Sequence, residues 1–308
     1  MGITCLGEDS VYRFTCDVHY LYDIVWERKN MLRALLIALC GAMLWSPGNL
    51  AALESSPHRI ISLAPSLTRE IYDLGAGDLL VGVTLYRPEA ARSKEIVGTL
   101  TKLNFEKIFS LKPDLVLASK DSNTKTDIEK LMALGLNVVV FEGCTSLSCI
   151  CDEFERLGSL LGKEHESEEI LHEVRQKIAH IGSSIKGRKP VKVFWQMGAT
   201  PLVSISDASF AGEYIRLAGC ENIFADAPAS YPRINIEEVI ARNPDVIITV
   251  AEMESDSVQA LWSTMDDISA VKNRRVYSLN ADLVCQPTPR MFAKGFELVV
   301  KSLYPGVL

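Results

Sequence analysis

Aromatic and polar side chains come within three residues after several short, mainly apolar runs of the 308-residue sequence. Tyr86 comes after the run 80–83, Lys120 after 115–118, and Gln196 after 191–195. If these runs are parallel strands, their carboxyl ends meet at one edge of a sheet, where helix N-termini also present free N–H groups. We therefore expect a ligand-binding pocket at this edge, lined by Pro65, Ser66, Tyr86, Lys120, Trp195, Gln196, Met197, Tyr231, Arg233, Asp282 and Arg290.

The chemistry of this set suits a bulky ligand with an apolar face and a polar rim. Tyrosine and tryptophan rings offer flat apolar surface with a hydrogen-bonding edge. Glutamine, lysine and arginine side chains bind amides, phosphates or carboxylates. The alternative for each aromatic residue is packing in a core or anchoring of a loop. For Arg290, which follows Pro289, the alternative is bracing of its own loop.

The sequence contains none of the common catalytic signatures. We find no G-x-S-x-G, no G-x-x-x-x-G-K-[ST] and no H-E-x-x-H. The segment Leu74-Gly-Ala-Gly77 follows a helical pattern, whereas a dinucleotide-binding loop leads from a strand into a helix. We therefore expect no catalytic residue, no cofactor and no enzymatic activity.

Histidine spacing argues against a site for a bare transition-metal ion. After residue 57, the histidines are His58, His165, His172 and His180. The last three fall on one predicted helix, where seven residues rise about 10 Å, too far for two of them to share one ion. We expect no metal site, although a metal already wrapped in a chelating ligand is compatible with the sequence.

Five cysteines follow residue 52, and their pairing is open from sequence alone. Cys149-Ile-Cys151 has metal-hook spacing but lacks a second pair of ligands, so small apolar residues or one local disulfide are the expected roles. An odd number leaves at least one thiol outside any disulfide. The five are Cys144, Cys149, Cys151, Cys220 and Cys285.

The N-terminal region has the order of a secretory signal, and the charge argues against nucleic acid. Basic residues flank Met31, and an apolar run over 34–45 precedes small residues at 51–52. That run is shorter than the roughly 20 residues of a membrane span. We expect 31–52 to be a signal peptide and 1–30 a wrongly assigned extension. Leu39 before Cys40 disfavours a lipid anchor, and a net charge of −7 disfavours phosphate binding.

The chain contains a diverged internal repeat. Asn104-Phe-Glu-Lys-Ile108 leads to Lys112-Pro-Asp114 and an apolar run, and Asn235-Ile-Glu-Glu-Val239 leads to Asn243-Pro-Asp245 and another. Both blocks hold the same register without a gap. Each predicts an N-capped amphipathic helix, a proline stop and a fully buried strand.

Predicted strands alternate with predicted helices in both halves, which is typical of parallel sheets covered by helices. The strands are 59–64, 115–118 and 138–141, then 191–195, 246–250 and 275–279. Between them, 163–186 has apolar residues at helical spacing and would reach roughly 36 Å as one helix. We predict an α/β fold of two Rossmann-like lobes, 57–162 and 188–308, joined by one long helix over 163–187.

An ordered set of segments resembles the substrate-binding proteins of ABC importers for vitamin B12, haem and iron chelates, in which a rigid helix joins two lobes (the class III periplasmic binding protein fold). The match to 194–198 and 282–290 is nearest to the cobalamin-binding branch. The segments are Arg59-Ile-Ile-Ser-Leu-Ala-Pro-Ser66, Lys112-Pro-Asp-Leu-Val116, Gly219-Cys-Glu-Asn-Ile-Phe224, Tyr231-Pro-Arg233, Asn243-Pro-Asp-Val-Ile247 and the stretch Ala281 to Arg290.

The resemblance implies a monomeric periplasmic protein that delivers cobalamin or a related corrinoid to an inner-membrane ABC permease and its ATPase. A ferric siderophore or haem is the alternative ligand, and a sensory or structural protein on the same fold is the alternative of another class. The family docks through one exposed glutamate per lobe; here Arg69 holds that place and Glu70 follows, so Glu70 is the expected docking residue. Cys285 stands near the second acidic position, and Leu100 and Leu283 replace pocket tryptophans of cobalamin binders.

Overall fold

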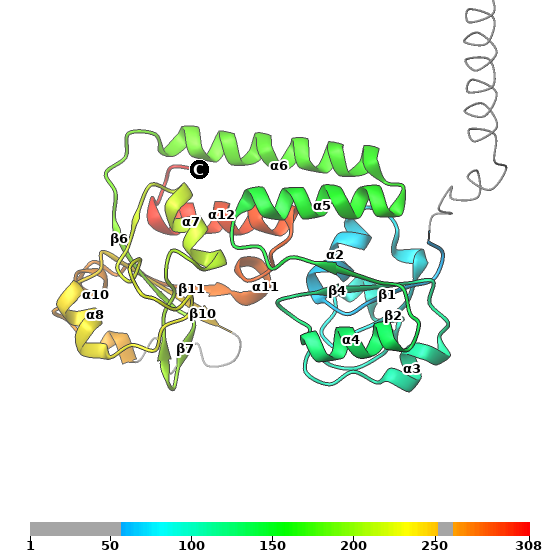
Figure 1. The fold of residues 1–308 in the computed structure, drawn as a ribbon. Helices are drawn as coiled ribbons and strands as arrows, with labels where there is room; N and C mark the ends of the chain where they lie inside the picture. The colour runs from blue at the N-terminus through cyan, green and yellow to red at the C-terminus, as the bar shows by residue number, and fades with distance from the viewer. Residues whose placement is uncertain (1–56, 252–260) are drawn as a thin grey trace, which may run out of the picture. The chain divides into compact units, whose positions relative to one another are not determined.

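Two open parallel β-sheets carry the described part of the fold (Figure 1). The structure is a computed structural model that describes residues 57–251 and 261–308. The predicted extension over 1–30, the predicted signal peptide over 31–52 and Cys40 lie outside the described residues. The predicted lobe boundaries 57–162 and 188–308 stay predictions, since contacts join 56–308 into one compact unit.

The first sheet has five strands in the order β3-β2-β1-β4-β5, all parallel. Strand β4 is buried at every position, as a central parallel strand covered on both faces must be. The strands are β1 (Ile60–Ser62), β2 (Leu80–Val83), β3 (Glu95–Ile96), β4 (Leu115–Ser119) and β5 (Val138–Phe141). The helices are α2 (Pro65–Asp73), α3 (Phe105–Ser110), α4 (Lys125–Ala133) and α5 (Leu147–Leu161), with short 3₁₀ turns η1 (Gly77–Leu79) and η2 (Glu89–Ala91).

The second sheet has four parallel strands in the order β11-β10-β6-β9, beside a separate two-stranded hairpin. The two parallel sheets confirm the predicted α/β class. The strands are β6 (Lys192–Gln196), β7 (Gly198–Ala199), β8 (Leu202–Val203), β9 (Glu221–Asn222), β10 (Val246–Ala251) and β11 (Val276–Asn280). The helices are α7 (Phe210–Leu217), α8 (Ile236–Arg242), α10 (Ser269–Lys272), α11 (Ala281–Val284) and α12 (Pro289–Leu303).

One continuous helix, α6 (Glu164–Ile185), joins the two sheets, as the spacing of its apolar residues predicts. Its 22 residues reach about 33 Å. Leu171 and Val174 in its first half pack in the core of the first sheet, whereas Ile181 and Ile185 pack in the core of the second. Figure 1 shows α6 running alongside α5 and α12, with which it makes its main helix contacts. The helix is therefore anchored in both lobes.

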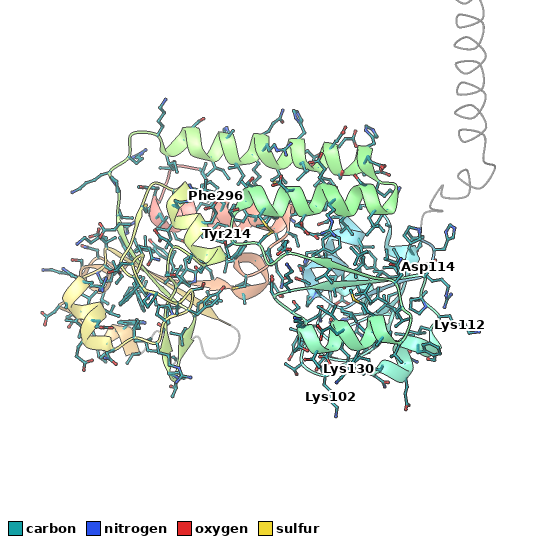
Figure 2. The ribbon with its side chains drawn as sticks, viewed as in Figure 1. Lys102, Lys112, Asp114, Lys130, Tyr214 and Phe296 are labelled. Carbon is teal, nitrogen blue, oxygen red and sulfur yellow. A yellow bond between two sulfur atoms is a disulfide. The ribbon has the colours of Figure 1, made fainter. Side chains whose placement is uncertain are left out.

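The C-terminal helix α12 also packs in the cores of both lobes, which the sequence did not reveal. Ala293 packs in the first-lobe core, while Phe292 and Phe296 pack in the second-lobe core. The Phe292 ring stacks on Tyr214 of α7 with 4.6 Å between centroids. Figure 2 labels Phe296 and Tyr214 beneath α6. Helix α12 thus holds the lobes together alongside α6.

Both copies of the internal repeat start their helix in the predicted way. The Asn104 side chain accepts a hydrogen bond from the Lys107 N–H at 2.9 Å, capping α3. Asn235 and Glu238 form a reciprocal capping box at the start of α8. Each helix is followed by a left-handed residue directly before the proline, Lys112 with φ 47° and Asn243 with φ 43°. The same local geometry is thus repeated in each half.

The aspartate after each proline fastens the first strand of its own lobe. Asp114 Oδ2 accepts a hydrogen bond from the His58 N–H at 2.7 Å, and Asp114 Oδ1 accepts one from the Arg59 N–H at 3.1 Å. In the second lobe, Asp245 Oδ2 accepts one from the Lys192 N–H at 2.9 Å. In return, the Asp114 and Asp245 N–H groups donate to the Arg59 and Lys192 carbonyls. Figure 2 shows Asp114 at the outer edge of the first lobe.

Replacing either aspartate by alanine should destabilise the fold. Asp114→Ala or Asp245→Ala removes the acceptor for backbone N–H groups at a strand start, which we expect to lower the free energy of unfolding by about 1 kcal/mol. Urea denaturation measures the change. Asp152→Ala, at an exposed carboxylate on α5, is the control and should alter stability little. Equal stability of all three variants would contradict the fastening role.

Candidate ligand-binding site

A cavity of about 440 Å³ lies at the carboxyl ends of the strands of both sheets. From the first lobe it is lined by Pro65 and Ser66 at the start of α2, Asp121 after β4, and Gly143 and Thr145 after β5. Because the strands are parallel, the loops that follow them gather at this edge, as predicted. The first-lobe wall is therefore built from strand-end loops and a helix N-terminus.

The opposite wall comes from the second lobe. Met197 follows β6, Phe210 begins α7, and Val284 and Cys285 end α11. Tyr231 comes from the loop before α8 and is 51% exposed. Most of these groups are apolar, which suits a ligand with a large apolar face.

Four of the predicted binding residues line this cavity: Pro65, Ser66, Met197 and Tyr231. The walls also contain residues that sequence reasoning missed, chiefly Asp121, Gly143 and Phe210. Leu100, which resemblance placed at a tryptophan position of cobalamin binders, lines the cavity as well. A cavity thus lies at the edge where the sequence predicts the pocket, lined by part of the predicted set, and its role in ligand binding stays a prediction.

Trp195 and Gln196 do not line the cavity, and the prediction that they do is wrong. Strand β6 continues to Gln196, one residue beyond its predicted end, and all of 193–196 is buried. Trp195 is fully buried and stacks on Tyr214 with 6.1 Å between ring centroids. Gln196 is 2% exposed and accepts a hydrogen bond from Trp262 Nε1 at 2.8 Å. Only the residue after the strand, Met197, reaches the cavity.

Four further predicted residues are exposed and lie outside the cavity wall: Tyr86, Lys120, Arg233 and Asp282. Tyr86 is 63% exposed on the loop after β2. Lys120 Nζ forms an ion pair with Glu142 Oε1 at 2.5 Å. Asp282 lies in the first turn of α11, where its N–H donates to Asn280 Oδ1. Lys120 misses the cavity by one position, since Asp121 lines it.

Arg290 braces the lobes instead of lining the cavity. At the start of α12, its guanidinium lies 3.7 Å from Asp73 Oδ1 at the end of α2 and 3.6 Å from Glu173 Oε2 of α6. Arg290 is not among the cavity-lining residues, which does not support its predicted binding role, and its contacts are with α2 and α6 instead of with its own loop. These partly exposed contacts contribute little to stability individually.

Glu70 cannot be an exposed docking group. Its side chain is 5% exposed, because it lies on the buried face of α2 together with Leu67 and Ile71. Burial, reinforced by the nearby charges of Asp73 and Glu153, raises the pKa of this carboxyl well above its usual range. The expectation that Glu70 meets a permease arginine is therefore wrong.

Two titratable groups of the cavity wall have pKa values that are raised by their surroundings. Burial of the phenol, together with nearby Cys285 and Asp121, raises the pKa of Tyr231, so its hydroxyl stays protonated and can donate a hydrogen bond. Desolvation also raises the pKa of Asp121. Gly143 lacks a side chain at the point where a Cβ atom would collide with the Asp121 carboxylate. The glycine thus leaves room for a carboxylate in the wall.

A disulfide bond joins Cys144 to Cys149 and closes the loop that enters α5, which resolves the open pairing. Cys144 itself lines the cavity and packs in the second-lobe core. Within this loop the Leu147 N–H donates to Glu213 Oε1 of α7 at 3.3 Å. The disulfide therefore closes a loop of the first lobe, and apolar packing and this hydrogen bond hold the loop against the second lobe. Cys151 is buried in the first-lobe core, where burial raises the pKa of its thiol.

Within 57–251 and 261–308, no three histidine, cysteine, aspartate or glutamate side chains gather as a metal site. In those same ranges, no helix combines the length and apolarity needed to cross a bilayer.

Two parallel-sheet lobes, tied by long helices and facing each other across a cavity, are the architecture of a two-lobed solute-binding protein. A family model described as "Periplasmic binding protein" matches residues 60–283, which covers both sheets. The chain belongs to this family, whose members are binding proteins and not enzymes.

The most similar relatives include the vitamin B12-binding protein of Vibrio cholerae serotype O1. It is 34% identical over 263 residues, which cover 84% of this chain and 94% of the relative. The crystal structure of the periplasmic vitamin B12 binding protein of Vibrio cholerae superposes with a TM-score of 0.71 at 32% identity, covering 80% of this chain and 97% of that one. A possible iron-binding periplasmic solute-binding protein from Staphylococcus epidermidis gives 0.72 at 28% identity, covering 81% and 100%.

Substitutions should separate core residues from cavity residues. Trp195→Ala leaves a large void in the second-lobe core, and we expect it to lower the free energy of unfolding by about 3–5 kcal/mol. Tyr231→Ala, at a half-exposed cavity residue, should cost roughly 1 kcal/mol or less. Urea denaturation of both variants measures the difference. A Trp195→Ala protein as stable as Tyr231→Ala would contradict the buried placement of Trp195.

Removing the disulfide should loosen the loop between the lobes. Cys144→Ser/Cys149→Ser opens a short covalent loop, for which we expect a stability loss of about 2 kcal/mol. Urea denaturation with and without a reductant provides the control. Reductant should destabilise the wild-type protein by the same amount and leave the double variant unchanged. A wild-type protein insensitive to reductant, under conditions where its thiols are shown to be reduced, would refute the stabilising role.

Proposed function

We propose that this protein binds cobalamin, or a related corrinoid, in the cavity between its lobes and delivers it to an ABC importer. The observation that carries the proposal is the 34% identity to a vitamin B12-binding protein over 263 residues. A match that covers 84% of the chain extends over parts of both lobes and is not confined to one of them.

The chemistry of the walls supports a corrinoid. Phe210, Met197 and Leu100 offer apolar contact to the flat macrocycle, and Tyr231 offers a hydroxyl donor at the edge. A cavity of about 440 Å³ is smaller than a complete corrinoid, so part of the ligand would project from the opening between the lobes. Tyr231, half exposed, is placed to cover that projecting part.

The proposed partners follow from this function. An ABC permease with its ATPase in the inner membrane would receive the ligand, and the protein would act as a monomer in the periplasm after export. Because Glu70 is buried, docking would use other surface groups. The two helices that enter both cores favour release driven by the permease over a wide hinge opening of the free protein.

An iron chelate or haem is the second candidate, and Tyr231 is the observation that favours it. A phenol oxygen is a ligand for haem iron and for ferric ions. The Staphylococcus epidermidis neighbour, described as a possible iron-binding protein, is consistent with this candidate. Tyr86, the other tyrosine considered, lies outside the cavity.

Calorimetric titration with cyanocobalamin, haemin and a ferric siderophore tests the two candidates. We expect one-to-one binding of cyanocobalamin and no saturable binding of the other two. Tyr231→Ala should weaken cobalamin binding roughly tenfold, because it removes an aromatic contact and a donor. Tyr86→Ala is the matched control and should bind as the wild type does. Absence of cobalamin binding, or equal affinity of both variants, would count against the proposal.

A further inference from the structure

A narrow side pocket of about 20 Å³ adjoins the main cavity behind α2. Ser66, Asp121, Cys144 and Pro287 line both spaces. A side arm of a ligand held in the main cavity can therefore reach the side pocket. The volume is close to that of a single water molecule, so it admits a terminal N–H₂ or O–H group, with the rest of the ligand's side arm in the main cavity.

The polar lining of the side pocket consists mainly of hydrogen-bond acceptors. Four carboxyl groups contribute to it, from Glu70 on α2, Asp121 after β4, Glu142 after β5 and Glu153 on α5. No lysine, arginine or histidine is among the described residues that line it. Two of the four carboxylates already have cationic partners on the outside, since a lysine pairs with Glu142 at 2.5 Å and an arginine with Glu153 at 3.0 Å.

Glu70 is the deepest of these groups and lacks a partner of its own. Its side chain is only 5% exposed, yet it borders the side pocket. Among the described residues its carboxyl forms no hydrogen bond or ion pair. It is buried, and the charges that act on it are the like charges of Asp73 and Glu153. An unpartnered buried carboxyl is unfavourable, and a donor entering the pocket would satisfy it.

We propose that this side pocket recognises a primary amide of the ligand and rejects a carboxylate at the same place. The inference rests on the proposed function, because the corrin ring of cobalamin carries primary amides on flexible arms. An amide N–H₂ group donates two hydrogen bonds, which the Asp121 carboxylate and the carbonyl oxygen of the Glu70 carboxyl can take, and the amide carbonyl accepts one from the Glu70 O–H when that carboxyl is protonated. A carboxylate offers no donor and brings a negative charge beside Glu142 and Glu153.

The pocket is less suited to other small occupants. A metal ion would need three converging ligands, and no such group exists among the described residues. A larger cationic head group exceeds the space of about 20 Å³. The hydroxyl-bearing side chains of the lining are Ser66 and Ser119, so four carboxyl groups outnumber two hydroxyl groups there.

Cobalamin derivatives in which one peripheral amide is hydrolysed to a carboxylate test the proposal. Dissociation constants for cyanocobalamin and its separate monocarboxylates are measured by calorimetry at about pH 7.5. We expect at least one monocarboxylate to bind the wild-type protein roughly tenfold or more weakly than cyanocobalamin does. The reason is that its carboxylate lacks the N–H donor and brings a negative charge beside the carboxylates of the side pocket. All monocarboxylates binding within about twofold of cyanocobalamin would overturn the inference.

The variant Glu70→Gln/Asp121→Asn decides whether the side pocket is responsible. This double variant keeps the shape of the side pocket, removes two acidic groups and adds amide donors. The dissociation constant of the affected monocarboxylate, divided by that of cyanocobalamin, should therefore fall towards one. Glu129→Gln/Asp266→Asn removes two exposed carboxylates elsewhere and should keep the wild-type ratio. An unchanged ratio in the first double variant would overturn the inference. Should that variant fail to fold, Asp121→Asn alone, at an exposed carboxylate, should still lower the ratio.

These binding measurements also distinguish a failure of the amide selectivity from a failure of the proposed cobalamin-binding function. Failure of wild-type protein to bind cyanocobalamin overturns both. Tight binding of cyanocobalamin without discrimination against any monocarboxylate overturns only the amide selectivity and leaves the transport function standing.

Discussion

The fixed spacing of the two lobes is the constraint on which the other features depend. Helices α6 and α12 each bury apolar side chains in both cores, so a change in the angle between the lobes would expose apolar side chains of each helix. Arg290 adds contacts from α12 to Asp73 and Glu173, which lie on different helices. Because the lobes are held in this way, the cavity between them exists before any ligand arrives. A preformed cavity spares the ligand the free energy of ordering its own site.

The loop that enters α5 shows how this constraint shapes the cavity. Cys144 and Ile150 come from the first-lobe chain but pack in the second-lobe core, with the disulfide to Cys149 closing the turn between them. Glu213 reaches across from α7 to the Leu147 N–H of the same loop. This loop is thus closed by its own disulfide and joined to the second lobe by apolar packing and one hydrogen bond, so the cavity-lining residue Cys144 is positioned by contacts with both lobes.

Buried polar atoms near this junction fall into two kinds. The Trp195 Nε1–H and the Tyr214 hydroxyl are enclosed among apolar side chains and have no partner among the described residues. Their aromatic rings stack on each other, so packing offsets the cost of the unmade hydrogen bonds. Glu70 differs, since it borders an open space that adjoins the cavity. The unmade hydrogen bonds of Trp195 and Tyr214 are therefore explained by core packing. The unpartnered carboxyl of Glu70 is explained by the ligand group that we propose for the side pocket.

The sequence by itself determined the two parallel sheets, the long helix (predicted over 163–187 and observed over 164–185) and the duplicated cap, proline and aspartate segments, because all of these depend on local periodicity and local hydrogen bonds. It also predicted a pocket at the strand ends, where the structure has a cavity. Only the tertiary structure decided which side chains face that pocket: Met197 and not Trp195, Asp121 and not Lys120. Side chains of a strand alternate between opposite faces, so an error of one residue in the strand end changes the exposed residue. The burial of Glu70 and the bracing role of Arg290 likewise depend on partners distant in sequence, which no local pattern specifies.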